Sequence, residues 1–417
     1  MKRTLARTIT VLALVVLAAP ALATNGYFSL GYGTPYKGMA GAGQALHLNT
    51  MASATNPATI AFVKGYDLSV GLFNPNRDYT VSGNPSGYPG TFGLAPGTYE
   101  SDSSIFVMPG LAAAWHLSGR FHVGLAIYGN GGMNTDWSNP VFGQAPTGVN
   151  LMQAFVAPSF TYEFADHQAI GVSPILGWQS FEAKGLSAFA MFSSNPAKLT
   201  NNGSDTSTGF GARIGYHGKF GEHLGVGASY QTKIAMGEFD EYAGLFAEQG
   251  DFDIPENWTV GLAIFPAKGW TLAIDFQEIY YSKVRSIGNP MLPNLMKAPL
   301  GADGGAGFGW QDVSVWKLGL QYEVSPKTTI RAGFAHCDQP IPESEVLFNI
   351  LAPGVIEEHL TVGFTTLLSE KSALHFALMR GFSSSVEGPN PLEAPGQQKI
   401  ELRMDQWEAE VGFSFGF

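Results

Sequence analysis

The sequence predicts an all-β protein, a 14-stranded antiparallel transmembrane β-barrel with a small N-terminal hatch plugging the lumen. Three observations lead to this fold. Stretches of about ten residues alternate apolar with small or polar side chains, and the connections between them are alternately short and long. The chain has 52 Gly and 29 Phe in 417 residues, and only 14% of it is charged, where about 25% is usual. Strands that meet lipid on one side have this composition.

The first 23 residues have the pattern of a secretory signal peptide. Basic residues precede an apolar run from Val11 to Ala19, which ends at the small-residue site Ala21-Leu22-Ala23. We expect the mature chain to begin at Thr24. No later stretch reaches the roughly 18 to 20 uninterrupted apolar residues of a membrane-spanning helix.

Residues 24–65 do not alternate, and we expect them to form the hatch, with the barrel at residues 66–417. The segment is rich in Gly and ends in a short Ala-rich region that contains Asn56-Pro57-Ala58. Barrels of about eight strands fill with their own side chains, while those of sixteen or more enclose a channel. A barrel of intermediate size therefore needs a plug.

The alternating stretches are clearest where aromatic residues mark one face. In WKLGLQYEV, Trp316, Leu318 and Leu320 share one face, and Lys317 lies on the other. The strands are predicted at residues 66–73, 104–117, 120–129, 151–164, 169–183, 207–220, 222–236, 255–265, 269–283, 311–324, 327–337, 355–368, 371–382 and 404–417.

The lengths of the connections separate a membrane barrel from a soluble sandwich. Outer-membrane barrels have short periplasmic turns and longer extracellular loops, and a sandwich has no reason to sort its loops in this way. The order of the connections places both chain ends in the periplasm. Phe413, Phe415 and Phe417 of the last strand would then face lipid. The short connections are 118–119, 165–168, 221, 266–269, 325–327 and 369–371, and the long ones are 74–103, 130–150, 184–206, 237–254, 284–310, 338–354 and 383–403.

Charge and motif content disfavour several other functions. A formal net charge of −11 disfavours nucleic acid as a partner, since that partner requires a basic surface. Cys337 is the only cysteine, so no internal disulfide forms. The nine histidines occur in no nucleophile or metal-ligand spacing. We therefore predict no catalytic residues, no metal and no cofactor, which disfavours a barrel enzyme. An open diffusion porin is a further alternative, which a large steady conductance would reveal.

Three longer stretches resemble a known family. NGYFSLGYGTPYKGMAGAGQAL followed by ATNPATIAF is similar to the N-terminal hatch of the FadL family of outer-membrane transporters for long-chain fatty acids. DFDIPENWTVGLA at 251–263 and FGWQDVSVWKLGLQYEVSPKTTIRAGFAHCDQPIP at 308–342 are also similar to that family. Some relatives take up monoaromatic hydrocarbons, so both ligand classes stay open.

The resemblance implies a passive route through a monomer surrounded by outer-membrane lipids. A hydrophobic small molecule would bind to extracellular loops, enter a lumenal pocket, and leave sideways through a gap made by a kink in the third strand. We expect that kink at Gly129, Asn130, Gly131 and Gly132, because Gly permits backbone angles that interrupt a ladder. An ordinary Gly-rich loop is the alternative. The resemblance assigns the gate to Asn56, Pro57 and Ala58, which could equally be a turn inside the plug.

Apolar residues in two long loops are candidates for capture, since exposed apolar patches usually bind something. Packing into small loop cores is the alternative. The predicted capture groove contains Leu186, Phe189, Met191, Phe192, Phe239, Tyr242, Leu245 and Phe246.

A fatty-acid carboxylate would require a cation in the lumen. Alternation turns Arg213, Lys233, Lys317 and Arg331 inward, where pairing with residues such as Asp275 is the alternative. Gln311 is a further pocket candidate, at a position where the resemblance implies a lysine. This departure leaves the substrate class open.

Overall fold

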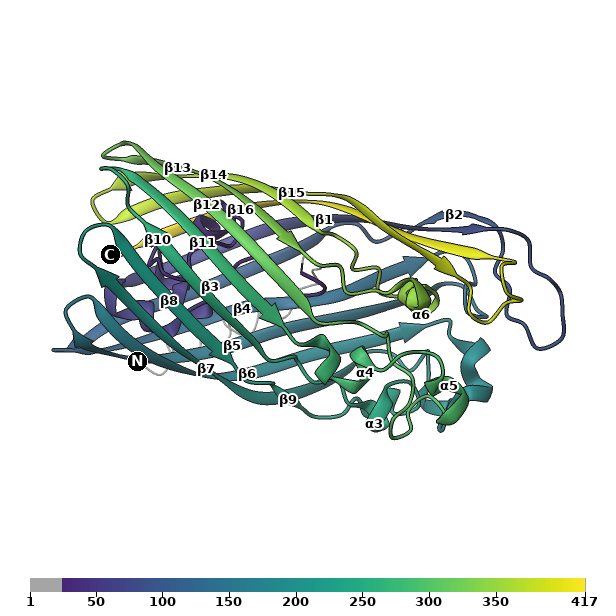
Figure 1. Ribbon diagram of the computed structural model, residues 1–417. Helices are drawn as coiled ribbons and strands as arrows, with labels where there is room; N and C mark the ends of the chain where they lie inside the picture. The colour runs from purple at the N-terminus through teal and green to yellow at the C-terminus, as the bar shows by residue number, and fades with distance from the viewer. Residues whose placement is uncertain (1–24, 417) are drawn as a thin grey trace, which may run out of the picture.

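The computed structural model describes residues 25–416. The predicted signal peptide, Thr24 and Phe417 lie outside the described residues. The described chain is a long barrel of tilted antiparallel strands, with the C-terminal end of β16 at one end and helix-containing loops at the other (Figure 1).

Sixteen strands are described, and fourteen of them form the closed wall, because β2 and β9 only extend its edges. β1 and β16 pair along their whole length, from Tyr66 opposite Phe415 to Ser82 opposite Lys399, which closes the sheet on itself. The predicted fold class and strand number are confirmed. The wall strands are β1 (Gly65–Ser82), β3 (Phe106–Ser118), β4 (Phe121–Trp137), β5 (Thr147–Ala165), β6 (Gln168–Lys184), β7 (Asp205–Phe220), β8 (Leu224–Gln231), β10 (Asn257–Ile264), β11 (Trp270–Ile279), β12 (Val313–Ser325), β13 (Thr328–Cys337), β14 (Glu358–Ser369), β15 (Ser372–Pro389) and β16 (Lys399–Phe415). The two edge pieces are β2 (Gly97–Glu100) and β9 (Ala235–Met236).

Several strand ends differ from the prediction. β1 runs on to Ser82 although Asn74, Pro75 and Asn76 resemble turn residues. It continues because β16 and β15 extend beside it, and β2 adds a short fourth strand, so the ladder hydrogen bonds come from neighbours rather than from local preference. These strands project beyond the rest of the wall (Figure 1).

The two faces of the wall follow the predicted alternation. On β12 the outward Trp316 is 56% exposed, while the inward Lys317 is 7% exposed. Phe413 and Phe415 are also outward and part exposed, as expected for side chains that face lipid. Among the described residues, the structure contains no helix with the length and apolar character needed to span a membrane.

The connections are sorted by end, as predicted. The short turns lie at the end that holds the C-terminal end of β16, and the long connections at the opposite end contain short helices (Figure 1). These helices are η3 (Ser187–Phe192), η4 (Pro196–Lys198), η5 (Asp240–Tyr242), α3 (Ala247–Gly250), η6 (Tyr281–Lys283), α4 (Arg285–Gly288), α5 (Asn294–Lys297), η7 (Glu343–Glu345) and α6 (Val346–Asn349).

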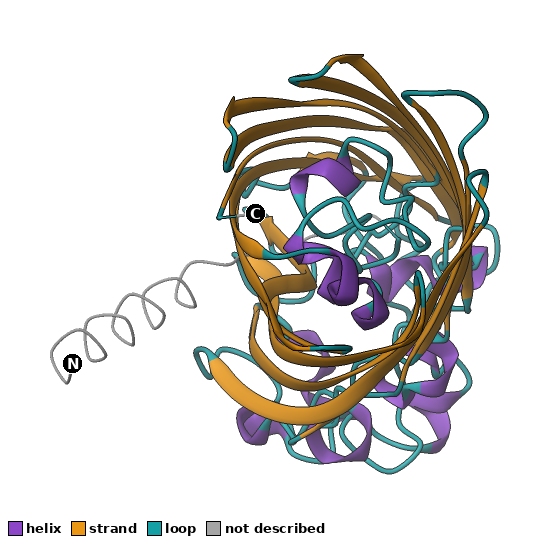
Figure 2. Cartoon of the chain, turned by 90° about the vertical axis from the view of Figure 1, so that its left-hand side faces the viewer, coloured by secondary structure: helices purple, strands orange, loops and turns teal. Residues whose placement is uncertain are grey.

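The hatch, residues 25–64, fills the inside of the barrel (Figure 2). It contains three short helices, α2 (Thr34–Lys37), η1 (Thr50–Ala54) and η2 (Pro57–Phe62). Asn56 caps η2 by accepting a hydrogen bond at Oδ1 from Ala58 N (3.1 Å), and Pro57 occupies the first helical position. The backbone of the plug is thus paired within short turns, as an interior segment requires.

Glycines on the inner face of the wall make room for this hatch. A Cβ at Gly171 would lie 2.5 Å from Ala58 N, and one at Gly215 would lie 2.9 Å from Pro57 Cδ. Real Cβ atoms do not approach so closely, so these positions require glycine. Part of the high Gly content therefore reflects a hatch that touches the wall directly.

Candidate passage between the wall and the hatch

The wall splits between β3 and β4 halfway along their length. The last bridged pair is Gly110 with Tyr128, and from Gly129 onward β4 is paired with β5 but no longer with β3. The register with β5 shifts between Gly129 and Gly131, so Asn130 is the extra residue of a bulge. The predicted kink lies at these residues. The prediction that the strand ends at residue 129 is wrong, because β4 continues to Trp137.

Local chemistry favours a split at this place. Pro109 on β3 has no N–H to donate, and it is the first residue beyond the last bridged pair. Asn130 is buried, and its side chain accepts from Tyr32 Oη (2.9 Å) and donates to Gln153 Oε1 (3.1 Å). The bulge thus turns the side-chain amide of Asn130 into the lumen, where Tyr32 of the hatch donates a hydrogen bond to it.

The start of the hatch pairs with the freed edge of β4. Gly132 N donates to Tyr27 O (3.0 Å) and Ser29 N donates to Asn130 O (3.0 Å), around a bridge between Phe28 and Gly131. A Cβ at Gly131 would overlap the Tyr27 carbonyl oxygen, so the close approach requires glycine there. Residues 27–29 therefore replace β3 as the partner of β4. No local sequence signal pointed to Tyr27, Phe28 and Ser29.

A small cavity remains at the split. It has a volume of about 30 Å³, enough for one or two waters and far too small for a hydrocarbon ligand. The split is therefore closed in this state. Its lining combines Met108, Pro109 and Gly110 of β3, Tyr128 and Gly129 of β4, and hatch residues that include Tyr32, Lys37 and Met51, with Glu410 of β16.

Lys37 ties the hatch to β16 beside this cavity. Its ammonium contacts Glu408 Oε1 and lies 2.7 Å from Glu410 Oε2, and all three side chains are buried. Thr34 Oγ1 also donates to Glu410 (2.6 Å). Burial by itself lowers the pKa of Lys37, but the two carboxylates outweigh burial and raise that pKa above its ordinary value. The lysine is therefore charged, and it anchors the hatch electrostatically.

The Asn56-Pro57-Ala58 turn lies elsewhere, against β5, β6 and β7. Asn56 Nδ2 donates to Tyr216 O (2.8 Å), and Thr161 Oγ1 donates to Pro57 O (2.6 Å). The resemblance assigned the gate, which we expected to meet the strand kink, to this turn. The structure instead places residues 27–29 there.

Two of the predicted lumenal cations lie together. Arg213 and Lys317 line one cavity of about 30 Å³. Arg213 donates to Ala54 O, Gln231 Oε1 and Tyr128 Oη, and Lys317 Nζ donates to Leu30 O (2.9 Å) and Gln277 Oε1 (3.0 Å). Neither cation makes an ion pair within the described residues.

Asp275, on the wall of the same cavity, accepts from Gly43 N (2.8 Å) and Gln44 N (2.9 Å) of the hatch instead. This carboxylate therefore holds the hatch in place, and it attracts its cross-strand partner Lys317 without a direct ion pair between them. The two buried cations remain available to an anionic group in the lumen.

The other three pocket candidates lie outside this cavity. Lys233 falls between β8 and β9, with a side chain 48% exposed and paired to Asp253, so its predicted lumenal position is wrong. Gln311 is exposed and precedes β12. Arg331 faces inward but binds Gln321 Oε1 (2.8 Å) and Thr365 Oγ1 (2.6 Å) at a different cavity.

The predicted capture groove is closed in this state. Both halves pack into the loop core: Phe181 of β6 lies between Tyr242 (ring centroids 4.8 Å apart) and Phe246 (4.6 Å), and Phe189 of the other half lies 5.1 Å from Phe348 of α6. Met191 is 83% exposed. The alternative of a packed loop core therefore describes the geometry better than an open groove. The buried members are Leu186, Phe189, Phe239, Tyr242 and Phe246, while Phe192 and Leu245 are partly buried.

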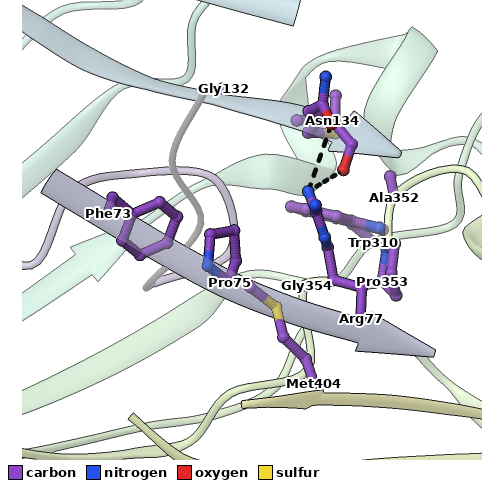
Figure 3. Close-up of a pocket in the computed structure, with 11 residues that line it drawn as sticks. Phe73, Pro75, Arg77, Gly132, Asn134, Trp310, Ala352, Pro353, Gly354 and Met404 are labelled. Carbon is purple, nitrogen blue, oxygen red and sulfur yellow. Dashed lines mark hydrogen bonds between the residues drawn. The ribbon is translucent and has the colours of Figure 1, made fainter. Parts of the chain in front are cut away.

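A buried arginine that the sequence did not single out lies between the split and the long loops. Arg77 of β1 contacts Asn134 of β4, and both help to line a small pocket together with Phe73, Trp310 and Met404 (Figure 3). Its guanidinium donates to Asn134 O and Ser103 O, and its Nε has no hydrogen-bond partner among the described residues. Ending β1 at residue 73 had placed Arg77 in a loop, so its burial was not foreseen.

Solved structures share this architecture. The toluene transporter TodX of P. putida superposes with a TM-score of 0.69 at 18% identity, covering 93% of this chain and 99% of that one. A FadL homologue of Pseudomonas aeruginosa gives 0.67 at 16% identity, covering 94% and 99%. The toluene transporter TbuX of Ralstonia pickettii gives 0.62 at 18% identity, covering 93% and 99%. Identities this low establish the fold alone.

Sequence comparisons settle the family. Curated protein sequences give no match to this chain. The family of outer membrane protein transport proteins (OMPP1/FadL/TodX) matches residues 15–389, which include the hatch, the split between β3 and β4, and every wall strand except β16. The chain therefore belongs to the OMPP1/FadL/TodX family of outer-membrane transport proteins.

Proposed function

We propose that this protein is a passive, hatch-gated channel that carries hydrophobic compounds across the outer membrane and releases them sideways between β3 and β4. The observation that carries the proposal is the split itself. β4 leaves β3 at Gly129, and residues 27–29 of the hatch bind the freed edge. Movement of this hatch segment opens a path from the lumen to the bilayer without exposing an apolar ligand to water.

Long-chain fatty acids are the first candidate substrates. Arg213 and Lys317 supply two buried positive charges without an ion-pair partner among the described residues. A carboxylate that enters this cavity would receive charge-assisted hydrogen bonds from both side chains. The alkyl chain would extend toward the apolar side chains above the hatch.

Monoaromatic hydrocarbons are the second candidate. The position where the family resemblance implies a lysine is Gln311 in this chain, and the solved structures TodX and TbuX are toluene transporters. An aromatic hydrocarbon requires only apolar lining, which the loop core around Phe181 and Phe246 provides once it loosens. Direct binding of palmitate and of toluene to the purified protein separates the two candidates.

Capture begins, in this proposal, at the extracellular loops. Met191 and the partly buried Phe192 and Leu245 offer the first apolar surface, and the buried members of the predicted groove become accessible as the loop core loosens. The mature protein acts as a monomer in the lipid of the outer membrane after residues 1–23 are removed. The closed lumen argues against a general diffusion porin, so we expect no large steady conductance from the wild-type protein.

A disulfide across the split tests lateral release. Pro109→Cys with Gly129→Cys joins the first positions beyond the last bridged pair, and Leu111→Cys with Ile127→Cys is the matched control within the intact ladder. We expect the first disulfide to stop uptake of labelled palmitate and toluene by cells, and a reductant to restore it. Binding should persist in both variants. Full uptake by the oxidised Pro109/Gly129 variant would refute lateral release at this split.

A further inference from the structure

The wall contains a second interruption, between β5 and β6. These strands are paired from Gly148 to Val156 on β5 and again from Phe160, but the three positions between are not bridged. Pro158 lies opposite Pro174 in the middle of this interval. The register is the same on both sides, so the strands remain aligned although they are not bonded there. We call residues 157–159 and 173–175 the proline seam.

The two prolines explain the missing hydrogen bonds. In an antiparallel ladder, the N–H and C=O of one residue point to the same neighbouring strand. Ser173 Oγ of β6 donates to Pro158 O (2.8 Å), so the carbonyl of Pro158 points toward β6. Its missing N–H would have pointed there too, and Pro174 offers none in return. An entire hydrogen-bonded pair is therefore absent, and the interval from Val156 to Phe160 spans roughly 13 Å of strand.

The seam joins the candidate ligand cavity on its inner side. Ser159 and Ser173 face the lumen and are completely buried, and Ser159 Oγ has no hydrogen-bond partner among the described residues. Ser173 is the cross-strand partner of Arg213, which is itself the partner of Gln231. A row of polar side chains therefore leads along the inner face from the seam to the cavity that Arg213 lines.

The hatch covers the seam from inside. The turn at Pro57 contacts Thr161 of β5 and Gly171 of β6, each two residues from the seam. Outside, just beyond the seam, an apolar groove of about 890 Å³ includes Phe160 and Val172, which are 54% and 41% exposed. The seam thus lies between the hatch and a groove whose volume is large enough for a hydrocarbon chain.

We propose that the proline seam is a second lateral portal, through which the hydrocarbon part of an amphiphilic ligand passes between the lumen and the bilayer when the Asn56-Pro57-Ala58 turn moves away. The inference rests on the proposed function, because it supplies another route for the same ligands. The portal opens without any register shift, since the bridged pairs Val156 with Leu176 and Phe160 with Val172 hold the strands on either side. The polar row keeps the head group solvated while the chain enters the lipid.

Labelling from the lipid side tests the portal without requiring transport. Ser159→Cys places a thiol in the lumen at the seam, and Ala263→Cys is the matched control, also completely buried and inward, where the ladder with Ala273 is intact. In liposomes that contain the full-length mature protein, pyrene maleimide dissolved in the bilayer should label Ser159→Cys about tenfold faster. Adding Pro158→Ala and Pro174→Ala to Ser159→Cys restores the two missing backbone N–H donors, so labelling should fall to the rate of the control. Equal labelling of the two cysteines would overturn the proposal.

A disulfide across the seam tests its part in uptake. Ser159 and Ser173 are directly opposed, a spacing suited to a disulfide, and Ala263→Cys with Ala273→Cys, an inward pair in the intact ladder of β10 and β11, is the control pair. We expect the seam disulfide to reduce palmitate uptake at least about twofold, reversibly with a reductant, while the control pair leaves uptake unchanged. Normal uptake with the seam oxidised, while the Pro109/Gly129 disulfide still blocks it, overturns the portal but not the proposed function. Absence of uptake by the wild-type protein overturns the proposed function, and the labelling result still tests the seam.

Discussion

Replacing Lys37 should release the hatch. Lys37→Met keeps the length of the side chain but removes the ammonium that Glu408 and Glu410 share. Both carboxylates are 3% exposed, so the variant leaves two adjacent buried charges without a counter-ion. The hatch then loses its electrostatic anchor on β16 next to the split.

The expected free-energy cost of Lys37→Met follows from the burial of the two carboxylates. Removing one partner of a buried ion pair costs about 3 to 5 kcal/mol, because the remaining charge stays desolvated. At about 1.4 kcal/mol per factor of ten, this shifts the ratio of docked to undocked hatch by roughly two to three and a half orders of magnitude. The barrel keeps its own ladder, so the cost should appear as hatch movement rather than as loss of the wall.

Single-channel recording in planar bilayers measures this movement. Wild-type protein should be nearly silent, while Lys37→Met should show frequent openings. Lys283→Met is the control, since Lys283 pairs with Glu256 at an exposed loop far from β16, and it should behave as wild type. Adding Glu408→Gln and Glu410→Gln to Lys37→Met should reduce the openings again, because it removes the unpaired charges. A silent Lys37→Met that retains the thermal stability of the wild type would refute the electrostatic anchor.

Three further predictions concern the hatch, the lumen and a loop. Gly131→Val should displace residues 27–29, because its side chain would overlap the Tyr27 carbonyl, and hydrogen exchange of these amides should accelerate about a hundredfold or more. Arg213→Gln should weaken palmitate binding about tenfold, as loss of a charge-assisted hydrogen bond does, and leave toluene binding unchanged in calorimetry. Burial and the neighbouring Asp253 raise the pKa of Asp251, in the loop after α3, to about 6, so the folded loop binds this proton more tightly than the unfolded chain. Acidification from about pH 7 to 5 should therefore stabilise the loop in thermal unfolding of the wild type, and Asp251→Asn should lose that gain.

The strands were predictable because a strand that faces lipid carries its pattern within a few residues. Trp316, Leu318 and Leu320 lie outward as their alternation requires, and the short turns lie at one end. Asp275 likewise faces inward, as its position within an apolar stretch indicated. Ends of strands were less predictable, since neighbouring strands extended β1 past residues that favour turns.

The candidate site was only partly predictable, because its geometry depends on contacts between distant residues. The glycines near residue 130 marked a place where β4 could leave its neighbour, but not that residues 27–29 would bind the freed edge. The alternation of side chains along a strand could not distinguish Arg213, which lies in a cavity, from Lys233, which lies outside the ladder. Loop residues such as Phe239 and Tyr242 proved buried because loops far apart in the chain pack together.

The sequence by itself determined the strand number, the lipid-facing side of each strand and the presence of a plug, since these follow from local alternation and composition. Only the tertiary structure decided where the wall is unpaired, which hatch residues close it, and which cations share the lumen. Those properties depend on register and closure of the sheet, and register joins residues that are separated by tens to hundreds of positions, such as Tyr66 and Phe415.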